Sequence, residues 1–278
     1  MGVQARSRGG SKVKVSIVLP SRGRPGLWFR MVNSALTTAR WPERVSIWTG
    51  LDKDDPTVAE YRQFAQQMSL RAAPKSGAVS FVTHEPGTPG RDMWNWLSKA
   101  AVDSGADFVM LGSDDIIFEE HKDKPAPAWD EVLFRVRAMQ RTDWPDGIYM
   151  VWGNDFSCGA RHATHPFLTR EWLLTVGKAM PLCCRQYDGD TFVTDIAKGT
   201  GRGIYTADII TRHNHPKYRG GQLDETSLRT KPQQAIDYVA YRGSEGQKEL
   251  LDAVNAVRVA TNQAPLIWPG MAQGMAAT

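Results

Sequence analysis

Two adjacent carboxylates, Asp114 and Asp115, are the residues of this sequence best suited to chemistry. They follow the apolar run Phe108–Leu111, which has the composition of a fully buried strand. Neighbouring carboxylates repel one another, and their hard oxygen atoms suit Mg²⁺ or Mn²⁺, ions that keep coordination places for a diphosphate. The pair therefore predicts a divalent-cation site that binds a phosphate-containing ligand. The alternative is a solvated turn in which the two side chains cap the next segment.

Polar side chains also follow two other predicted strands. Arg22 and Arg24 come after the apolar run 13–19, and four polar or acidic positions from Asp52 to Asp55 follow the run 44–49. In an open α/β sheet, ligands bind outside the carboxyl ends of the strands. Arginine guanidinium groups match phosphate with paired donors. Three polar strand ends therefore indicate a ligand site, whereas a single one would indicate only a turn before a helix.

Two histidines, His213 and His215, follow the last predicted strand, 203–210. Histidines in such a position can complete a metal site begun by distant carboxylates, and we expect them to join Asp115; the alternative is a surface position. A zinc site is disfavoured because the chain has no CxxC or HxxxH spacing among the remaining candidates, which are Cys158, His162, His165, Cys183 and Cys184.

These residues need a sheet to position them, and the chain alternates short β-rich runs with helical patterns, which predicts a mostly parallel α/β sheet. The last fifty residues change character and predict helices over 232–241 and 247–259. We expect a flexible basic arm over 1–12, a catalytic domain over 13–220 and a helical C-terminal extension over 221–278. Further strands are predicted over 79–83, 107–111 and 147–152, and further helices over 27–38, 57–70, 92–102, 129–140, 170–176 and 190–198.

Composition excludes several classes of protein. The 278 residues are 41% hydrophobic and 23% charged, as in ordinary globular proteins. A chain of this length can bury a hydrophobic core without needing disulfides or structural metals. Three cysteines cannot form a disulfide framework, and no apolar run approaches the ~20 residues of a membrane span. No signal-peptide hydrophobic region follows the basic N-terminus. We therefore expect a cytoplasmic protein without a membrane partner, and the net charge of +4 permits nucleic acid without requiring it.

Taken in order, these segments resemble the GT-A-fold glycosyltransferases, which use nucleotide-sugar donors, over residues 13–216. Residues 17–25 are similar to the first strand and nucleotide-binding loop of that family, and residues 112–115 stand in the place of its DXD motif, with Ser113 at the first Asp. The resemblance implies a GT-A-like (Rossmann-like), mostly parallel sheet flanked by helices, with a C-terminal helical extension. It extends to small members carried by tailed bacteriophages, whose acceptors include modified DNA bases and virion proteins.

The resemblance also implies a role for each matched residue. Asp115 and His213 would bind Mn²⁺ or Mg²⁺, and Asp114 would lie toward the ribose or a metal-bound water. Asp190 would be the base of an inverting reaction, with Asp188 as the second candidate. The residues that would bind the nucleotide sugar are Pro20, Ser21, Arg22, Arg24, Asp52, Arg91, Ser113 and Asp114.

The resulting hypothesis is a metal-dependent hexosyl- or pentosyltransferase that moves a sugar from a nucleotide donor to an acceptor hydroxyl on DNA or protein. One alternative is a nucleotidyltransferase with a similar α/β core, although its first loop would carry a Lys that residues 21–26 lack. The other is a non-catalytic protein that binds nucleic acid or a virion. That protein would show neither donor hydrolysis nor metal-stimulated nucleotide binding.

Overall fold

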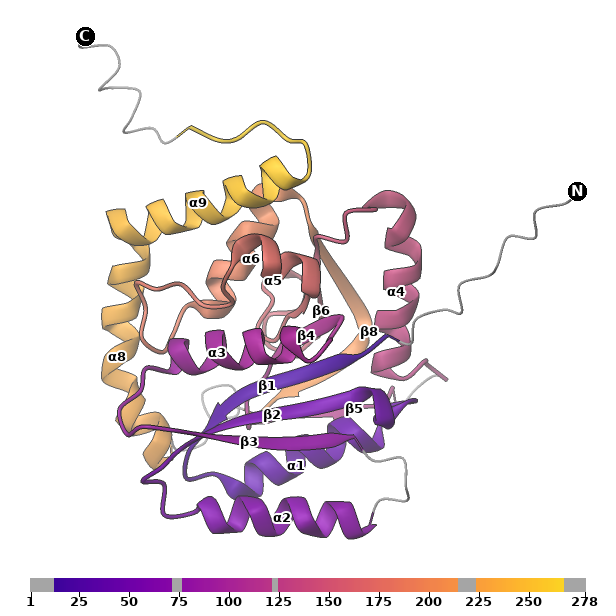
Figure 1. Ribbon diagram of the computed structural model, residues 1–278, viewed down its shortest axis with the longest axis vertical. Helices are drawn as coiled ribbons and strands as arrows, with labels where there is room; N and C mark the ends of the chain where they lie inside the picture. The colour runs from indigo at the N-terminus through magenta and orange to yellow at the C-terminus, as the bar shows by residue number, and fades with distance from the viewer. Residues whose placement is uncertain (1–12, 72–76, 122–124, 215–223, 268–278) are drawn as a thin grey trace, which may run out of the picture.

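The computed structural model describes residues 13–71, 77–121, 125–214 and 224–267 (Figure 1). The predicted basic arm, 1–12, lies outside the described residues. The described chain forms an eight-stranded sheet in the order β3-β2-β1-β4-β7-β6-β8-β5. Six strands share one direction: β1 (Val15–Ser21), β2 (Val45–Asp52), β3 (Ala78–His84), β4 (Phe108–Leu111), β6 (Met150–Asn154) and β8 (Gly203–His213).

The two remaining strands, β5 (Ile116–Glu119) and β7 (Phe167–Thr169), run antiparallel to their neighbours. Neither is among the strands that the sequence predicts. Runs of three or four residues carry too little periodicity to be recognised, and their pairing with β4, β6 and β8 is decided by residues far away along the chain. Apart from these two additions, the mostly parallel α/β sheet is confirmed.

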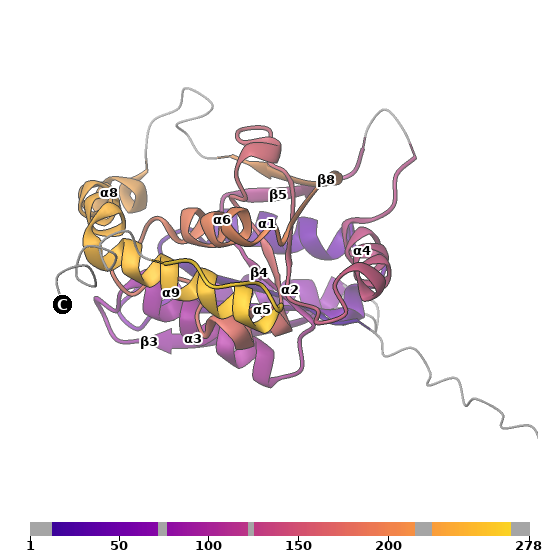
Figure 2. The same cartoon turned by 90° about the horizontal axis from the view of Figure 1, so that it is seen from above.

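Helices cover both faces of the sheet (Figures 1 and 2). Ile17 packs in a core layer with residues of α1, α2 and α4, whereas Val18 packs in the opposite layer with residues of α3, α5, α6 and α9. Because successive strand residues point to opposite faces, a central strand covered on both sides is continuously apolar. The helices are α1 (Pro25–Thr37), α2 (Val58–Arg71), α3 (Gly90–Asp103), α4 (Trp129–Asp143), α5 (Arg170–Val176), α6 (Gly189–Thr200), α8 (Glu225–Arg242) and α9 (Ser244–Ala260), with short 3₁₀ turns at Pro42–Arg44 and Gly159–Arg161.

The C-terminal helical region is present and packs on the body of the protein. Tyr241 of α8 and Val257 of α9 belong to the same core layer as Trp172 of α5. Helix α8 begins at Glu225, seven residues before the predicted start at Pro232. Proline is expected at the start of a helix rather than inside one, but here Asp224 caps an earlier start by accepting from the backbone N–H of Ser227.

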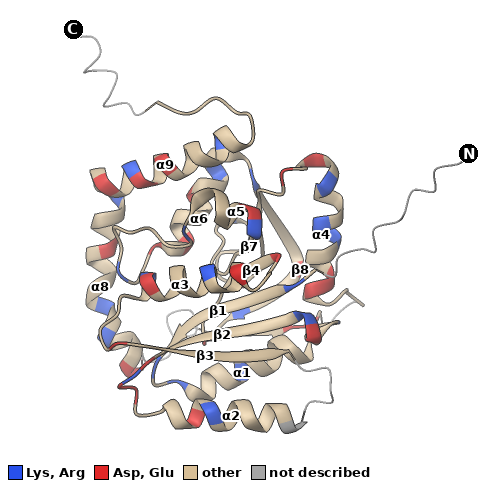
Figure 3. Ribbon diagram, in the orientation of Figure 1, with Lys and Arg blue, Asp and Glu red and all other residues tan. Residues whose placement is uncertain are grey.

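Charged residues of both signs are interspersed over the helices and the ends of the sheet (Figure 3). The ribbons of β1, β2 and β3 carry almost none along their length. This is expected of β1, which is buried on both faces, whereas the edge strand β3 is only partly buried. None of the helices in the described ranges is both long and apolar enough to cross a membrane.

Candidate active site

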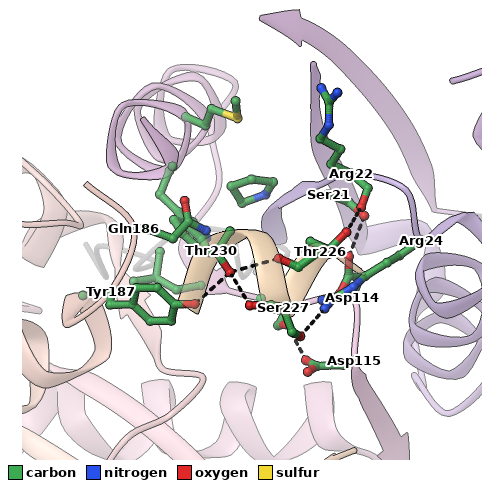
Figure 4. Close-up of a pocket in the computed structure, with 18 of the residues that line it drawn as sticks. Ser21, Arg22, Arg24, Asp114, Asp115, Gln186, Tyr187, Thr226, Ser227 and Thr230 are labelled. Carbon is green, nitrogen blue, oxygen red and sulfur yellow. Dashed lines mark hydrogen bonds and ion pairs between the residues drawn. The ribbon is translucent and has the colours of Figure 1, made fainter. Parts of the chain in front are cut away.

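A pocket of about 460 Å³ lies beyond the carboxyl ends of β1, β2 and β4. Helix α8 and the residues around the start of α6 form its other walls (Figure 4). The structure therefore confirms that the polar ends of these three strands converge on one site. Of the predicted site residues, those that line the pocket are Pro20, Ser21, Arg22, Arg24, Asp52, Ser113, Asp114, Asp115, Asp188, Asp190 and His213.

Among the described residues, one predicted site residue, Arg91, is not among those that line the pocket. The Arg91 guanidinium turns to the loop before α6, where it donates to the carbonyl oxygens of Leu182 and Cys184 and pairs with Asp92. Arg91 therefore organises that loop, and its contact with a nucleotide stays a prediction. His215 lies outside the described residues.

Asp114 joins the end of β4 to the loop after β1 through two hydrogen bonds. Ser21 Oγ donates to one carboxylate oxygen over 2.6 Å, and Arg24 Nη1 donates to the other over 3.0 Å (Figure 4). The Tyr61 hydroxyl lies 2.8 Å from Ser21 Oγ and accepts from the Arg24 backbone N–H. Burial raises the pKa of Asp114 to about 6, against the opposing charge of Arg24. Both oxygens of Asp114 are thus used within the protein.

The two predicted phosphate-binding arginines already have carboxylate partners. Arg22 Nη1 lies 2.9 Å from Asp52 Oδ2, and the same guanidinium pairs with Asp54. Arg24 pairs with Asp114 and with Asp224, which precedes α8. Asp52, Arg22 and Arg24 therefore lie at the pocket, as predicted. In this structure, however, both arginines form ion pairs with aspartates of the protein.

Asp115, His165 and His213 form a cluster whose candidate ligand atoms all lie within 4.8 Å of one another. His213 Nε2 is 3.4 Å from Asp115 Oδ2, the His165 and His213 rings meet edge to face with their centroids 4.9 Å apart, and Ser113 donates to Asp115. The sequence analysis names His165 only as a ligand of the disfavoured zinc site, because it belongs to no recognisable ligand spacing. Its one signal is its place directly before the short strand β7, which antiparallel pairing lays beside β4.

The protonation states of His165 and Asp115 suit a cation. Burial and the neighbouring His213 lower the pKa of His165 to about 3, so its imidazole is neutral at pH 7. Burial opposes ionisation of Asp115, but the interactions with His213 and Ser113 outweigh it and hold the pKa of that carboxyl below its usual range. A metal ion requires neutral imidazole and ionised carboxylate ligands.

His165 carries a second sign of a ligand site. Its side chain is 7% exposed, and its Nδ1 atom has no hydrogen-bond partner among the described residues. A buried polar atom without a partner is costly, and a cation coordinated by the cluster relieves such a cost. Two imidazoles and one carboxylate are a donor set for divalent transition metals, and three protein ligands leave positions open for a substrate.

Asp190 and Asp188 lie at the start of α6 and line the pocket. Asp190 Oδ2 is 2.9 Å from His162 Nε2, and its side chain is 36% exposed. Asp188 is 12% exposed and lies 3.5 Å from Arg242 Nη1. Burial raises the pKa of Asp188, with a smaller opposing effect from Arg242. Asp190 is therefore the more accessible of the two carboxylates.

No protein-family model and no curated protein matches the sequence. Among solved structures, the chain is similar to the mannosyltransferase PcManGT from Pyrobaculum calidifontis in complex with GDP-Man and Mn²⁺, with 14% identity, 96% of this chain and 81% of that chain covered, and a TM-score of 0.52. TarS 1–349 from S. aureus in complex with UDP-GlcNAc is a weaker likeness, with 12% identity, coverage of 89% and 73%, and a TM-score of 0.48. The fold is therefore GT-A-like.

Replacing a ligand should remove metal binding. We expect Asp115→Ala and His165→Ala each to weaken Mn²⁺ binding at least ~100-fold, because even partners that only orient a ligand contribute about 10–100-fold to metal affinity. Isothermal titration calorimetry with Mn²⁺ alone measures this. His162→Ala, which removes a histidine three positions away and outside the cluster, is the matched control. Unchanged Mn²⁺ affinity in His165→Ala would contradict the three-ligand site.

The His162–Asp190 pair should make stability depend on pH. The hydrogen bond between His162 and Asp190 raises the pKa of His162, and burial opposes this increase. A raised pKa means that this stabilisation is complete below the unfolded value of about 6.5 and is lost as pH rises through the folded value. Urea unfolding of His162→Gln between pH 6 and 9 should show a flatter decline in stability than the parent protein. Parallel declines would show that the pair contributes nothing.

Proposed function

We propose that this protein is a metal-dependent glycosyltransferase that uses a nucleotide-sugar donor. The observation that carries the proposal is one pocket that holds two chemically different groups: a cluster that could hold a cation, and two carboxylates at the start of α6, of which Asp190 is the more accessible. The GT-A-like fold and the Mn²⁺ and GDP-Man of the similar mannosyltransferase support it.

On the donor side, Asp115, His165 and His213 would hold Mn²⁺ or Mg²⁺, with His215 as a further candidate. The cation would offset the charge that develops on the nucleotide diphosphate as the glycosidic bond breaks. Ser113 occupies the first position of the DXD-like segment and orients Asp115, to which it donates. Pro20, Ser21, Arg22, Arg24, Asp52 and Asp114 form the surrounding wall against which the nucleotide would bind.

On the acceptor side, Asp190 would remove the proton of the attacking hydroxyl, which would then displace the nucleotide with inversion. Its accessibility favours it over Asp188, which is more buried and faces Arg242. His162 donates to Asp190 when its Nε2 is protonated, and this bond orients the carboxylate.

The nature of the acceptor follows from the resemblance to the small enzymes of tailed bacteriophages. We propose a modified DNA base or a virion protein, met in the host cytoplasm, as the acceptor of a hexosyl or pentosyl group. We also propose that 13–220 is the catalytic domain and 221–278 its helical extension. A nucleotidyltransferase remains the alternative activity, and the experiment that follows separates the two.

A screen of nucleotide ligands tests the proposal. One class among UDP-, GDP-, ADP- and CMP-sugars should raise the melting temperature only when Mn²⁺ or Mg²⁺ is present. A ligand at about 100 times its Kd contributes ~2.7 kcal/mol, which is roughly 5–10 °C for a chain of this size. Nucleoside triphosphates serve as the comparison. A larger shift with a triphosphate favours nucleotidyl transfer, and no shift with any nucleotide contradicts both activities.

Replacing the two carboxylates separates chemistry from binding. Asp190→Asn keeps the shape but removes the proton acceptor, so sugar transfer should fall ~10²–10⁴-fold, the usual contribution of a general base, while donor affinity stays near that of the parent. Asp188→Asn should have a much smaller effect. Transfer rate and donor Kd are measured for both variants with the donor found in the screen. The opposite order would exchange the roles, and full activity in both would contradict the inverting mechanism.

A further inference from the structure

One helix, α8, contacts both walls of the pocket. Beside its first turn, Asp224 accepts from Arg24 Nη2 over 2.6 Å and from Arg24 Nε over 2.7 Å. Ser227 Oγ accepts from the same guanidinium over 2.7 Å, and Thr226 Oγ1 donates to the carbonyl oxygen of Arg22 over 2.9 Å (Figure 4). The start of α8 is thus fastened to the loop that follows β1.

Further along the same helix, Asp237 fastens the opposite wall. Its carboxylate accepts from three consecutive backbone N–H groups, those of Arg185 at 2.9 Å, Gln186 at 2.7 Å and Tyr187 at 2.8 Å. The Tyr187 hydroxyl also donates to Thr230 Oγ1 over 2.8 Å (Figure 4). Residues 185–187 lead directly into Asp188 and the start of α6, so α8 fixes the segment that carries both acidic side chains.

The electrostatics of Asp237 suit a permanent anchor. The residue is 1% exposed, and Gln233 adds a fourth hydrogen bond to its carboxylate at 2.8 Å. Burial opposes ionisation, but the N–H donors of the loop and of Gln233 outweigh it and lower the pKa of Asp237. The loop is therefore arranged around a fixed negative charge. Consecutive backbone N–H groups directed at one anion are a recurrent way of organising irregular backbone.

The backbone next to this anchor is in an unfavourable conformation. Asp188 has a φ of 64°, in the left-handed region that costs a non-glycine residue free energy and persists only where the surroundings hold it. The three N–H bonds to Asp237 immediately precede it, and Arg242 of the same helix faces its side chain. Helix α8 thus restrains the residue from both the backbone and the side chain.

We propose that Asp237 is a positioning residue of this pocket. It holds 185–187, and through them Asp188 and Asp190, at a defined place opposite the wall to which the start of α8 is fastened. The proposal rests on the proposed function for the statement that these carboxylates act on substrate. The C-terminal extension is then a working part of the site, because this one helix joins the loop after β1 to the segment that carries the two carboxylates.

Asp237→Asn is the direct test. The amide nitrogen of Asn is a donor, so one of the two acceptor atoms that face the loop is lost while the volume is kept. Hydrogen exchange at residues 185–188 should become at least ~10-fold faster. With the donor identified by the nucleotide screen, its Mn²⁺-dependent Kd should change less than about threefold and turnover should fall ~10²-fold, the effect of misplacing a catalytic group by about 1 Å.

Asp130→Asn is the matched control. Asp130 is fully buried and accepts from the backbone N–H groups of Arg40 and Trp41 at 2.8 and 2.9 Å, outside the pocket. The Asp130→Asn variant should have a lower free energy of unfolding than the parent protein, with little change in turnover. An equal loss of turnover in both variants would overturn the proposal by showing a general effect of destabilisation.

Two further outcomes keep the test decisive. If Asp237→Asn does not fold, Gln233→Met removes one hydrogen bond from the Asp237 carboxylate and should give the same pattern more weakly; no change at 185–188 in that variant would count against the proposal. If no nucleotide binds even the parent protein, the proposed function fails, while hydrogen exchange still decides whether Asp237 holds this loop. Unchanged exchange in Asp237→Asn overturns the positioning role.

Discussion

The ion pair between Arg24 and the buried Asp114 is the contact on which the shape of the pocket depends. A carboxylate at the end of a central strand loses its hydration, and such a group is tolerated only when charged and hydrogen-bonding partners surround it. Arg24 and Ser21 supply those partners from the loop after β1, and Arg24 continues to Asp224 at the start of α8. Three segments that are up to 200 residues apart in sequence are thereby held together.

The same ion pair explains how two neighbouring carboxylates come to differ. Both carboxylate oxygens of Asp114 accept hydrogen bonds, one from Ser21 and one from Arg24, and burial raises the pKa of Asp114. Asp115 faces His213 and His165 instead, and its pKa lies below the usual range. Because these two turn residues have different partners, one aspartate is committed to the architecture and the next remains available for a ligand.

The residues of the pocket are held in place in two ways, some by the sheet and others by side-chain contacts alone. The strand ends are positioned by parallel pairing along β1, β2 and β4, which gives Ser21, Asp52 and the Asp114–Asp115 pair a rigid base. The carboxylates before and within the first turn of α6 have no such ladder. Their place depends on contacts with His162, Arg242 and, through the backbone, Asp237. Helix α8 contacts both the loop that follows β1 and the segment that leads into α6.

The sequence by itself determined the α/β class, the parallel strands and the three polar strand ends, because these follow from local composition and periodicity. It also indicated which acidic residues reach the pocket, although their roles stay predictions. Tertiary structure alone decided that His165 joins Asp115, since the pairing of β7 with β4 is a long-range event. It likewise decided that Arg22 and Arg24 face carboxylates, that Arg91 turns away, and that the first turn of α8 closes the site. Each of these depends on which distant segments meet, and no local pattern records that.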